Sequence, residues 1–309
     1  MSIPPIALGG YAADFDAFSA QLGASFERYG FAVIADCDIP QPVIGETLAS
    51  AQAFFALPDA VKRAYVVPGG AGQRGYTPFG VETAKGAQHH DLKEFWHVGR
   101  SLPPGHPYRA IFGDNLWPAE VPDFREHLTA LYDALEALGD RLLQAIAHHL
   151  GLERGFFAAA VQDGDSILRL LHYPPVKGDG PSVRAGAHED INTITLLLGA
   201  EEAGLEVKDR DGHWLAINPP PGALVVNIGD MLQRLTNHVL PSTSHRVVNP
   251  APERARFSRY SMPFFLHFAP DYLIRTLPSC VSDERPDRYP QPITARDFLL
   301  QRLAEIKLR

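Results

Sequence analysis

Two potential metal ligands lie two residues apart near the middle of the chain. His188 and Asp190 follow the small residues Ala-Gly-Ala and precede the apolar run Ile-Asn-Thr-Ile-Thr-Leu-Leu-Leu. On an extended chain, residues two apart project to the same face. His188 and Asp190 can therefore bind one ion from a strand end, while Glu189 points away. Because His-x-Asp recurs by chance, the pair alone is weak evidence for a metal site.

A third potential ligand, His245, lies downstream in the segment Leu-Pro-Ser-Thr-Ser-His-Arg-Val-Val, where another apolar strand begins. Two imidazoles and one carboxylate on a β-structure are typical of the facial triad of non-heme iron oxygenases, which leaves coordination positions open. Three histidines and water would instead indicate zinc hydration chemistry. The sequence therefore predicts an iron site formed by His188, Asp190 and His245.

An anion site is predicted on a later strand, Arg-Tyr-Ser-Met-Pro-Phe-Phe-Leu-His-Phe. Arg259 and Ser261 project to one face of it, and a planar guanidinium beside a hydroxyl suits a carboxylate. Tyr173, in Leu-Arg-Leu-Leu-His-Tyr-Pro-Pro, can add a phenolic donor. Arg256 and Ser258 repeat the Arg-x-Ser pattern, but one regular strand cannot point both Arg256 and Arg259 inward. We expect Arg259 to face the site.

These candidate residues lie on short β-branched and aromatic runs between about residues 166 and 275, separated by turn residues. Such runs predict a barrel or a double-sheet jelly roll. Asp211-Gly212 is a typical tight-hairpin signal. Asn227 and Asp230, in Val-Val-Asn-Ile-Gly-Asp, are expected to serve a turn rather than the chemistry.

The first half reads mostly helical. Apolar residues recur at steps of three and four through 122–150, which predicts a long helix that supports the β-core. Gly30 is a plausible stop for an earlier helix, and Thr294-Ala-Arg-Asp297 resembles a capping box at the start of a final helix. Further expected elements are helices over 41–56, 59–65 and 294–308, a strand over 31–36, a loop with a strand edge over 69–80, and a loop over 103–118.

Composition narrows the class of protein. The 309 residues include 28 Lys and Arg and 36 Asp and Glu, a formal net charge of −8, which disfavours broad nucleic-acid binding. No apolar run approaches the roughly 18 residues of a membrane span. Only two cysteines are present, so a disulfide framework is absent and a reducing cytoplasm is the simplest compartment. Since no exposed heptad seam appears, a monomer is expected.

The ordered motifs resemble the isopenicillin N synthase-like Fe(II)/2-oxoglutarate dioxygenases over nearly the whole chain. The segments IPPIAL, YGFAVI and FFALP are similar to that family's helical N-terminal region. LRLLHYPP, AHEDINTITLLL, GALVVNIGDMLQRLTN, STSHRVV and RYSMPFF are similar to consecutive segments of its catalytic core. Several motifs in this order are far more specific than any one of them.

The resemblance implies a double-stranded β-helix (jelly roll) with helices, in the α+β class, with iron bound by His188, Asp190 and His245. It implies 2-oxoglutarate and O2 as co-substrates, with Arg259 and Ser261 on the distal carboxylate. The family's Asn-x-Tyr motif falls on Leu171-His172-Tyr173, so the tyrosine is kept and the asparagine is replaced. One compact unit over 1–309 is expected, with an N-terminal region over 1–120, a β-core over 160–275 and a C-terminal helix over 293–309.

The implied reaction is hydroxylation, or desaturation, of a small organic substrate with release of succinate and CO2. Candidate substrate-facing residues are taken from two aromatic and basic segments, 72–80 and 89–97, and from the late strand: Arg74, Tyr76, Phe95 and Phe265. The triplet His89-His90-Asp91 is interpreted as a solvated loop, because adjacent residues project differently.

Three other functions stay open at this point. An isopenicillin N synthase-like iron oxidase would share the triad without consuming 2-oxoglutarate. A non-catalytic module that binds small acids could use the same barrel, although it would not need open iron positions. A zinc hydrolase is disfavoured because the sequence lacks a His-Glu-x-x-His motif.

Overall fold

The computed structural model describes residues 3–70, 72–82, 89–175, 182–199 and 204–305. The helices are α1 (Gly10–Ala13), α2 (Phe15–Tyr29), α3 (Gln41–Phe55), α4 (Asp59–Arg63), α5 (Arg109–Phe112), α6 (Phe124–His149), α7 (Ala158–Val161), α8 (Asp230–Leu235), α9 (Pro252–Ala255) and α10 (Ala295–Glu305). The strands are β1 (Pro5–Ile6), β2 (Phe31–Ile34), β3 (Gly75–Thr77), β4 (Glu94–Gly99), β5 (Ile167–Tyr173), β6 (Ala185–His188), β7 (Ile194–Leu198), β8 (Leu205–Lys208), β9 (Trp214–Ala216), β10 (Leu224–Ile228), β11 (His245–Val247), β12 (Arg259–Leu266), β13 (Leu273–Ile274) and β14 (Ile293–Thr294).

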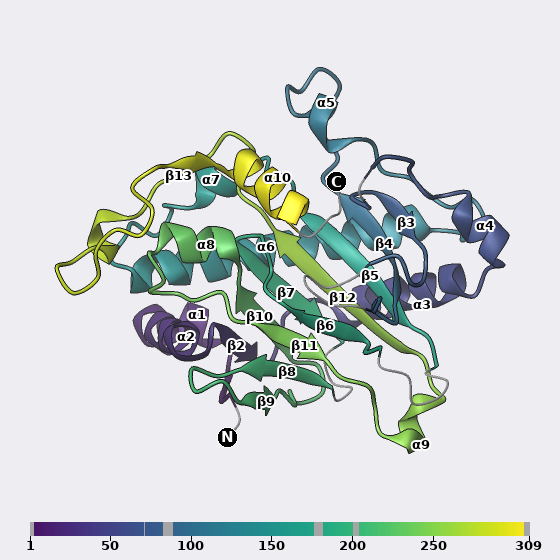
Figure 1. The fold of residues 1–309 in the computed structure, drawn as a ribbon, viewed down its shortest axis with the longest axis horizontal. Helices are drawn as coiled ribbons and strands as arrows, with labels where there is room; N and C mark the ends of the chain where they lie inside the picture. Colours follow the sequence, from purple (N-terminus) through teal and green to yellow (C-terminus); the bar gives the residue numbers. More distant parts are fainter. Residues whose placement is uncertain (1–2, 71, 83–88, 176–181, 200–203, 306–309) are drawn as a thin grey trace.

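Two sheets form the centre of the molecule (Figure 1). The large sheet has the strand order β1-β2-β10-β7-β12-β5-β4-β3, and the small sheet has the order β6-β11-β8-β9. Every pairing within them is antiparallel except that of β1 with β2. Two facing antiparallel sheets are the jelly-roll architecture that the short β-branched and aromatic runs of the sequence predict. The predicted fold class is therefore confirmed.

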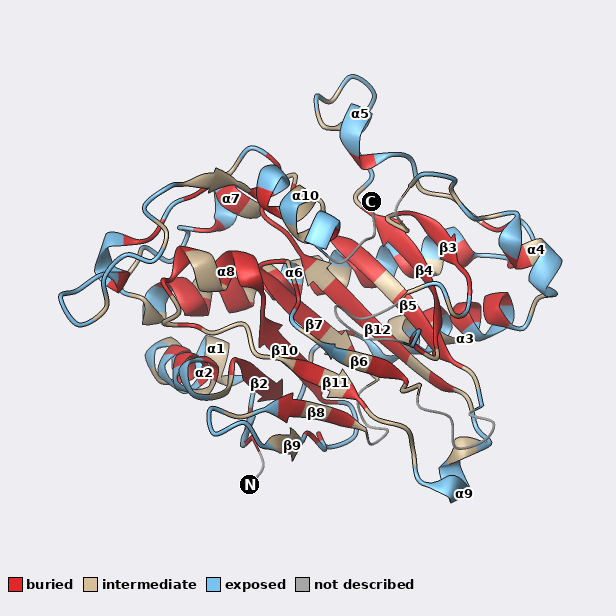
Figure 2. Ribbon diagram, viewed as in Figure 1, coloured by how far each residue is buried: buried red, intermediate tan, exposed pale blue. Residues whose placement is uncertain are grey.

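One face of the large sheet packs on the helices. The apolar stripe of α6, which includes Leu128, Leu135 and Leu142, is fully buried, and α6 contacts β7 and β12. Gly139 of α6 lets the helix approach the sheet closely, because an added Cβ would lie 2.5 Å from the Leu266 side chain. Figure 2 shows the central strands of the large sheet mostly buried, with short segments of intermediate exposure. Among the helices that the structure describes, none combines the length and apolar character that crossing a membrane requires.

The other face of the large sheet packs on the small sheet. A second apolar cluster joins residues of β2 and β10, such as Val33 and Val225, to residues of β8 and β11, such as Val207 and Val247. Because side chains alternate along each strand, every central strand of the large sheet sends one set of residues to the helices and the other between the sheets. Arg259, Ser261 and Tyr173 belong to the second set.

The N-terminal half contributes more strand than the sequence predicts. It supplies β1 to β4, and β2 pairs with β10 while β4 pairs with β5. The prediction of a mostly helical first half is therefore incomplete. Single short strands such as 94–99 carry too little periodicity to identify alone, and pairing with a distant strand fixes them. The expected loop over 103–118 contains the short helix α5.

The local turn and cap signals are confirmed. Gly30 ends α2 in the left-handed region at φ 68°, which suits a residue without Cβ. The β8–β9 hairpin turns at Asp211-Gly212, with Gly212 at φ 87°. Thr294 Oγ1 accepts from the Asp297 backbone N–H at 3.1 Å, as in a capping box.

A buried polar network ties β4 and β5 to the helices. Glu94 accepts from Lys62 at 2.7 Å, from Tyr76 and from His172 Nδ1 at 2.7 Å, and His172 Nε2 accepts from Ser258 at 2.9 Å. Burial alone would raise the pKa of Glu94, but the hydrogen bonds from His172, Lys62 and Tyr76 outweigh burial and lower it below its ordinary 4.5. Glu94 is therefore ionised in the folded protein at neutral pH.

The Glu94→Gln variant should be less stable by about 3–5 kcal/mol, because it leaves the buried ammonium of Lys62 without a counter-charge. A group whose pKa is lower in the folded than in the unfolded state stabilises the fold fully above its unfolded pKa. This contribution to stability is lost as pH falls through the folded pKa. The stability difference between wild type and variant should thus be constant above about pH 4.5 and shrink below it. Urea unfolding across this pH range measures it.

Glu120→Gln is the matched control. Glu120 is exposed and accepts from Tyr65 at 2.6 Å, so its loss should change stability by no more than about 0.5 kcal/mol. If Glu94→Gln lowers the free energy of unfolding no more than Glu120→Gln does, the buried network does not stabilise the fold.

Candidate iron and co-substrate site

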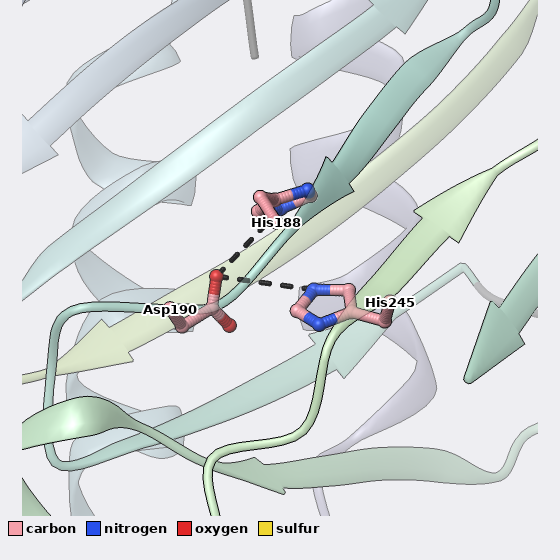
Figure 3. A group of neighbouring side chains, drawn as sticks. All are labelled: His188, Asp190 and His245. Carbon is pink, nitrogen blue, oxygen red and sulfur yellow. Dashed lines mark ion pairs between the residues drawn. The ribbon is translucent and has the colours of Figure 1, made fainter. Parts of the chain in front are cut away.

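The two histidines of the predicted triad face each other across the small sheet. His188 ends β6 and His245 begins β11, and the two are direct partners in the β6–β11 pairing. Their ring centroids lie 4.4 Å apart. Asp190 follows β6, and its Oδ1 lies 3.8 Å from His188 Nε2 and 3.9 Å from His245 Nε2 (Figure 3). The cross-strand pairing therefore brings His245 close to His188 and Asp190, which lie more than fifty residues earlier in the chain.

The ring orientations leave Nε2 of each histidine available as a ligand. His188 Nδ1 lies 2.7 Å from the Gly186 carbonyl oxygen, and His245 Nδ1 lies 3.2 Å from the Thr243 carbonyl oxygen. Because a carbonyl only accepts, each Nδ1 carries the proton and each Nε2 presents its lone pair. Metal-binding histidines are commonly fixed in this way.

Asp190 is held by two neutral donors on the large sheet. Its Oδ2 accepts from Thr195 Oγ1 at 2.6 Å and from Asn227 Nδ2 at 2.8 Å, which leaves Oδ1 facing the histidines. The prediction that Asn227 serves only a turn is wrong, because its side chain touches a ligand. Asn227 follows Val225 at strand spacing, and this alternation is the signal that would have placed it between the sheets.

The electrostatics keep Asp190 and His245 in their metal-binding forms. Burial alone would raise the pKa of Asp190, but His245, His188 and the two hydrogen bonds lower it. Burial and the neighbouring His188 lower the pKa of His245 to about 4. A carboxylate at Asp190 and a neutral imidazole at His245 are the forms that metal binding requires.

The predicted anion site lies between the sheets at one end of β12. Arg259 is 2% exposed, and within the described residues its Nε and Nη1 have no hydrogen-bond partner. Tyr173 is its cross-strand partner, with the ring centroid 5.2 Å from the guanidinium carbon. Ser261 is buried on the same face, opposite Leu171. Buried donors without partners indicate a missing anion, which the distal carboxylate of 2-oxoglutarate fits.

The rival Arg-x-Ser pair lies elsewhere. Arg256 is exposed at the end of α9 and lies over the exposed Phe257 ring at 4.9 Å. Ser258 is bonded to His172 on the helix-facing side of the large sheet. The geometry therefore favours Arg259, as the sequence predicts.

The four predicted substrate-facing residues occupy different places. Phe95 and Phe265 meet through Arg169, whose guanidinium carbon lies 4.1 Å and 5.1 Å from their ring centroids. Arg74 is buried and pairs with Asp165 at 3.0 Å. Tyr76 pairs with Trp96 on the opposite face of the sheet, and its hydroxyl donates to Glu94.

Two residues outside the predicted set, Asp91 and Arg169, lie near these side chains. Asp91 is 4% exposed, accepts from the Gly186 backbone N–H at 3.0 Å and pairs with Lys93 at 2.8 Å. The prediction that 89–91 is a solvated loop is therefore wrong for Asp91. Arg169 gave no sequence signal beyond the strand alternation of β5, on which it shares a face with Tyr173.

Comparisons with known families agree with this geometry. Residues 3–120 match a family described as the N-terminal region of a non-haem dioxygenase in morphine synthesis, and residues 164–268 match the 2OG-Fe(II) oxygenase superfamily. The second match contains all three triad residues together with Arg259, Ser261 and Tyr173.

Individual relatives are similar over most of their length. The chain is 36% identical to the 2-oxoglutarate-Fe(II) type oxidoreductase hxnY of Emericella nidulans, covering 90% of this chain and 82% of that one. A crystal structure of a protein from Caulobacter crescentus assigned to the 2OG-Fe(II) oxygenase family is 64% identical, with a TM-score of 0.93 over 98% of this chain and 99% of that one. A full-length Neurospora crassa protein crystallised in complex with alpha-KG is 30% identical, with a TM-score of 0.87 over 98% and 95%. The His188–Asp190–His245 cluster is thus an iron-binding site, and the chain belongs to the 2-oxoglutarate- and Fe(II)-dependent oxygenases.

Proposed function

We propose that this oxygenase hydroxylates a small organic molecule while 2-oxoglutarate is converted to succinate and CO2. The observation that carries the proposal is the buried guanidinium of Arg259, which lies between the same two sheets as the triad and has unpaired donors among the described residues. A three-residue ligand set leaves coordination positions for a chelating co-substrate and for O2. Desaturation is the other outcome that this chemistry allows.

Each residue has a distinct task in this proposal. His188, Asp190 and His245 hold Fe(II), while Arg259 and Ser261 bind the distal carboxylate and Tyr173 donates beside them. When bound, the iron and 2-oxoglutarate supply the oxidising chemistry. The protein fixes the geometry and excludes water from the space between the sheets.

Leu171 changes the character of one wall of the co-substrate pocket. It stands where the family's asparagine is found, and it packs with Phe95 and Tyr173 in a small apolar cluster. The Leu171 side chain therefore offers 2-oxoglutarate no hydrogen bond, and we assign the orientation of the co-substrate to Arg259, Ser261 and the iron. Phe95, one of the predicted substrate-facing residues, belongs to the same cluster.

The substrate is proposed to be a small molecule because relatives bind such compounds. The full-length Neurospora crassa protein has also been crystallised with alpha-KG and thymine, at 30% identity and a TM-score of 0.86. A monomer in the cytoplasm, without nucleic-acid or membrane partners, and the division into residues 1–120, 160–275 and 293–309 stay predictions from composition and motifs.

Anaerobic reconstitution with Fe(II), followed by titration with 2-oxoglutarate, tests the proposal. Chelation of iron through the 2-oxo and C1 carboxylate groups should give a weak visible charge-transfer band, and aerobic turnover should release succinate. Iron binding without a band or succinate would contradict the proposal and favour an oxidase that does not use 2-oxoglutarate.

A further inference from the structure

We propose that Asp91 is a positioning residue for the iron ligand His188. Its carboxylate holds a bulge in β6 through the backbone of Gly186, and that bulge sets the direction in which the imidazole points. This role concerns iron binding alone, so it is independent of the co-substrate and of the substrate. It is carried by the register of β6, the hydrogen bonds at Gly186 and the buried lysine that fixes the carboxylate.

β6 carries one extra residue immediately before the first iron ligand. In the pairing of β6 with β11, His188 lies opposite His245 and Ala185 lies opposite Val247. Three steps along β6 therefore match two steps along β11, so β6 contains a β-bulge between Ala185 and His188. A bulge disrupts the ladder of backbone hydrogen bonds and redirects the side chains beside it. The direction of the His188 ring thus depends on how the bulge is held.

β6 is an edge strand of the small sheet, and β11 is its neighbour in that sheet. The segment that precedes β4 supports its other side. The Leu92 backbone N–H donates to the Val183 carbonyl oxygen at 3.0 Å, and the Gly186 backbone N–H donates to Asp91 Oδ1 at 3.0 Å. An edge strand otherwise leaves such groups unpaired. Residues 91 and 92, from the N-terminal half of the chain, therefore take the place of a neighbouring strand.

The backbone of Gly186 joins the Asp91 carboxylate to the iron ligand. Its N–H donates to Asp91, and its carbonyl oxygen accepts from His188 Nδ1 at 2.7 Å. Because glycine has the widest range of backbone conformations, its position depends on such bonds. The His188 side chain is 35% exposed and that of His245 is 10% exposed, so packing restrains His188 less. Holding Gly186 therefore holds the ring that presents Nε2 to the metal.

Lys93 holds the Asp91 carboxylate in place. Its ammonium lies 2.8 Å from Asp91 Oδ2 and 2.7 Å from Glu82 Oε2, and the Lys93 side chain is only 6% exposed. Asp91 thus binds the ammonium with one oxygen and the Gly186 N–H with the other. Burial alone would lower the pKa of Lys93, but the carboxylates of Glu82 and Asp91 outweigh burial and raise it. The lysine is therefore charged, and a carboxylate bonded through both oxygens keeps one orientation.

Two double variants test this role, because both remove the buried charge pair and only one keeps the bond to Gly186. Asp91→Asn/Lys93→Met, the Asn variant, leaves an amide oxygen that can accept from the Gly186 N–H. Asp91→Leu/Lys93→Met, the Leu variant, has side chains of similar size and no acceptor. Anaerobic Fe(II) titration of the metal-free proteins should show the Asn variant within about threefold of wild type. The Leu variant should bind iron about tenfold more weakly or less tightly still, as expected for loss of an outer-shell partner of a metal ligand.

The absorption spectrum of the Co(II)-loaded proteins gives a second readout. Its visible bands depend on the number and geometry of the ligands, so they should change in the Leu variant and match wild type in the Asn variant. Glu94→Gln is the control for stability. It breaks another buried pair of a carboxylate and a lysine, Glu94 with Lys62 at 2.7 Å, and should lower stability without changing iron affinity or the spectrum. If circular dichroism shows the Leu variant unfolded, Asp91→Ala/Lys93→Met takes its place.

The comparison between the two double variants decides the result. Loss of iron affinity in the Leu variant, with affinity kept in the Asn variant, supports a role of the Gly186 bond in positioning His188. Equal iron affinity in the two double variants would overturn it, whether both match wild type or both fall below it. A loss of affinity in Glu94→Gln as large as that in the Leu variant would also overturn it, since iron affinity would then follow stability.

Discussion

Asp190→Ala should bind Fe(II) more than about 100-fold more weakly than the wild type, because loss of a direct ligand exceeds the 10- to 100-fold effect of losing an outer-shell partner. The two remaining imidazoles cannot complete the facial set, and the anionic charge that offsets the metal is removed. Anaerobic metal titration, followed by succinate release, measures both consequences.

Asn227→Leu is the variant to compare with Asp190→Ala, because it should weaken iron binding less. Asn227 donates to the non-ligating oxygen of Asp190 at 2.8 Å, so its removal should lower iron affinity by about 10- to 100-fold while the three ligands remain. Circular dichroism should show both variants folded. If Asp190→Ala binds iron as tightly as the wild type, Asp190 is not a ligand. If Asn227→Leu binds iron as tightly as the wild type, Thr195 alone orients the Asp190 carboxylate.

Arg259→Met should lose about 100-fold or more in affinity for 2-oxoglutarate, because truncating one partner of a buried charge pair costs about 3 kcal/mol. The same change should not lower the stability of the protein without ligand. The Nε and Nη1 donors of Arg259 are buried without partners among the described residues, so an apolar side chain of similar length relieves a desolvation cost. Titration of the visible band and urea unfolding without 2-oxoglutarate measure the two effects.

Arg256→Met is the control for Arg259→Met, since it changes an exposed arginine in the same sequence pattern. Its 2-oxoglutarate affinity should stay within about twofold of wild type, as for most surface changes. The opposite result, a band lost in Arg256→Met and kept in Arg259→Met, would reverse the assignment of the anion site.

The iron site could be predicted from the sequence because each of its ligands lies in a short segment with a recognisable strand pattern. His188 and Asp190 share a face through strand alternation alone, and His245 opens a recognisable apolar strand. Arg259 and Ser261 follow from the same rule. Family resemblance added the co-substrate, and the large antiparallel core followed from the run lengths.

The surroundings of the four predicted substrate-facing residues could not be predicted, because they depend on pairings between distant segments. Tyr76 and Phe95 looked equivalent in the sequence, but the β3–β4 register sends Tyr76 to the helices and Phe95 between the sheets. Asp91 is buried because it meets the backbone of Gly186, 95 residues away. Arg169 becomes notable only when Phe95 and Phe265 are seen on either side of it.

The arrangement of β12 has a consequence for how this protein can diverge. Arg259 and Ser261 lie at one end of the strand, and Phe265 lies at the other, on the same face. Successive residues advance about 3.3 Å, so roughly 20 Å of rigid strand separates the two ends. Selection can therefore alter the walls at the Phe265 end while the carboxylate-binding pair at the Arg259 end is inherited unchanged.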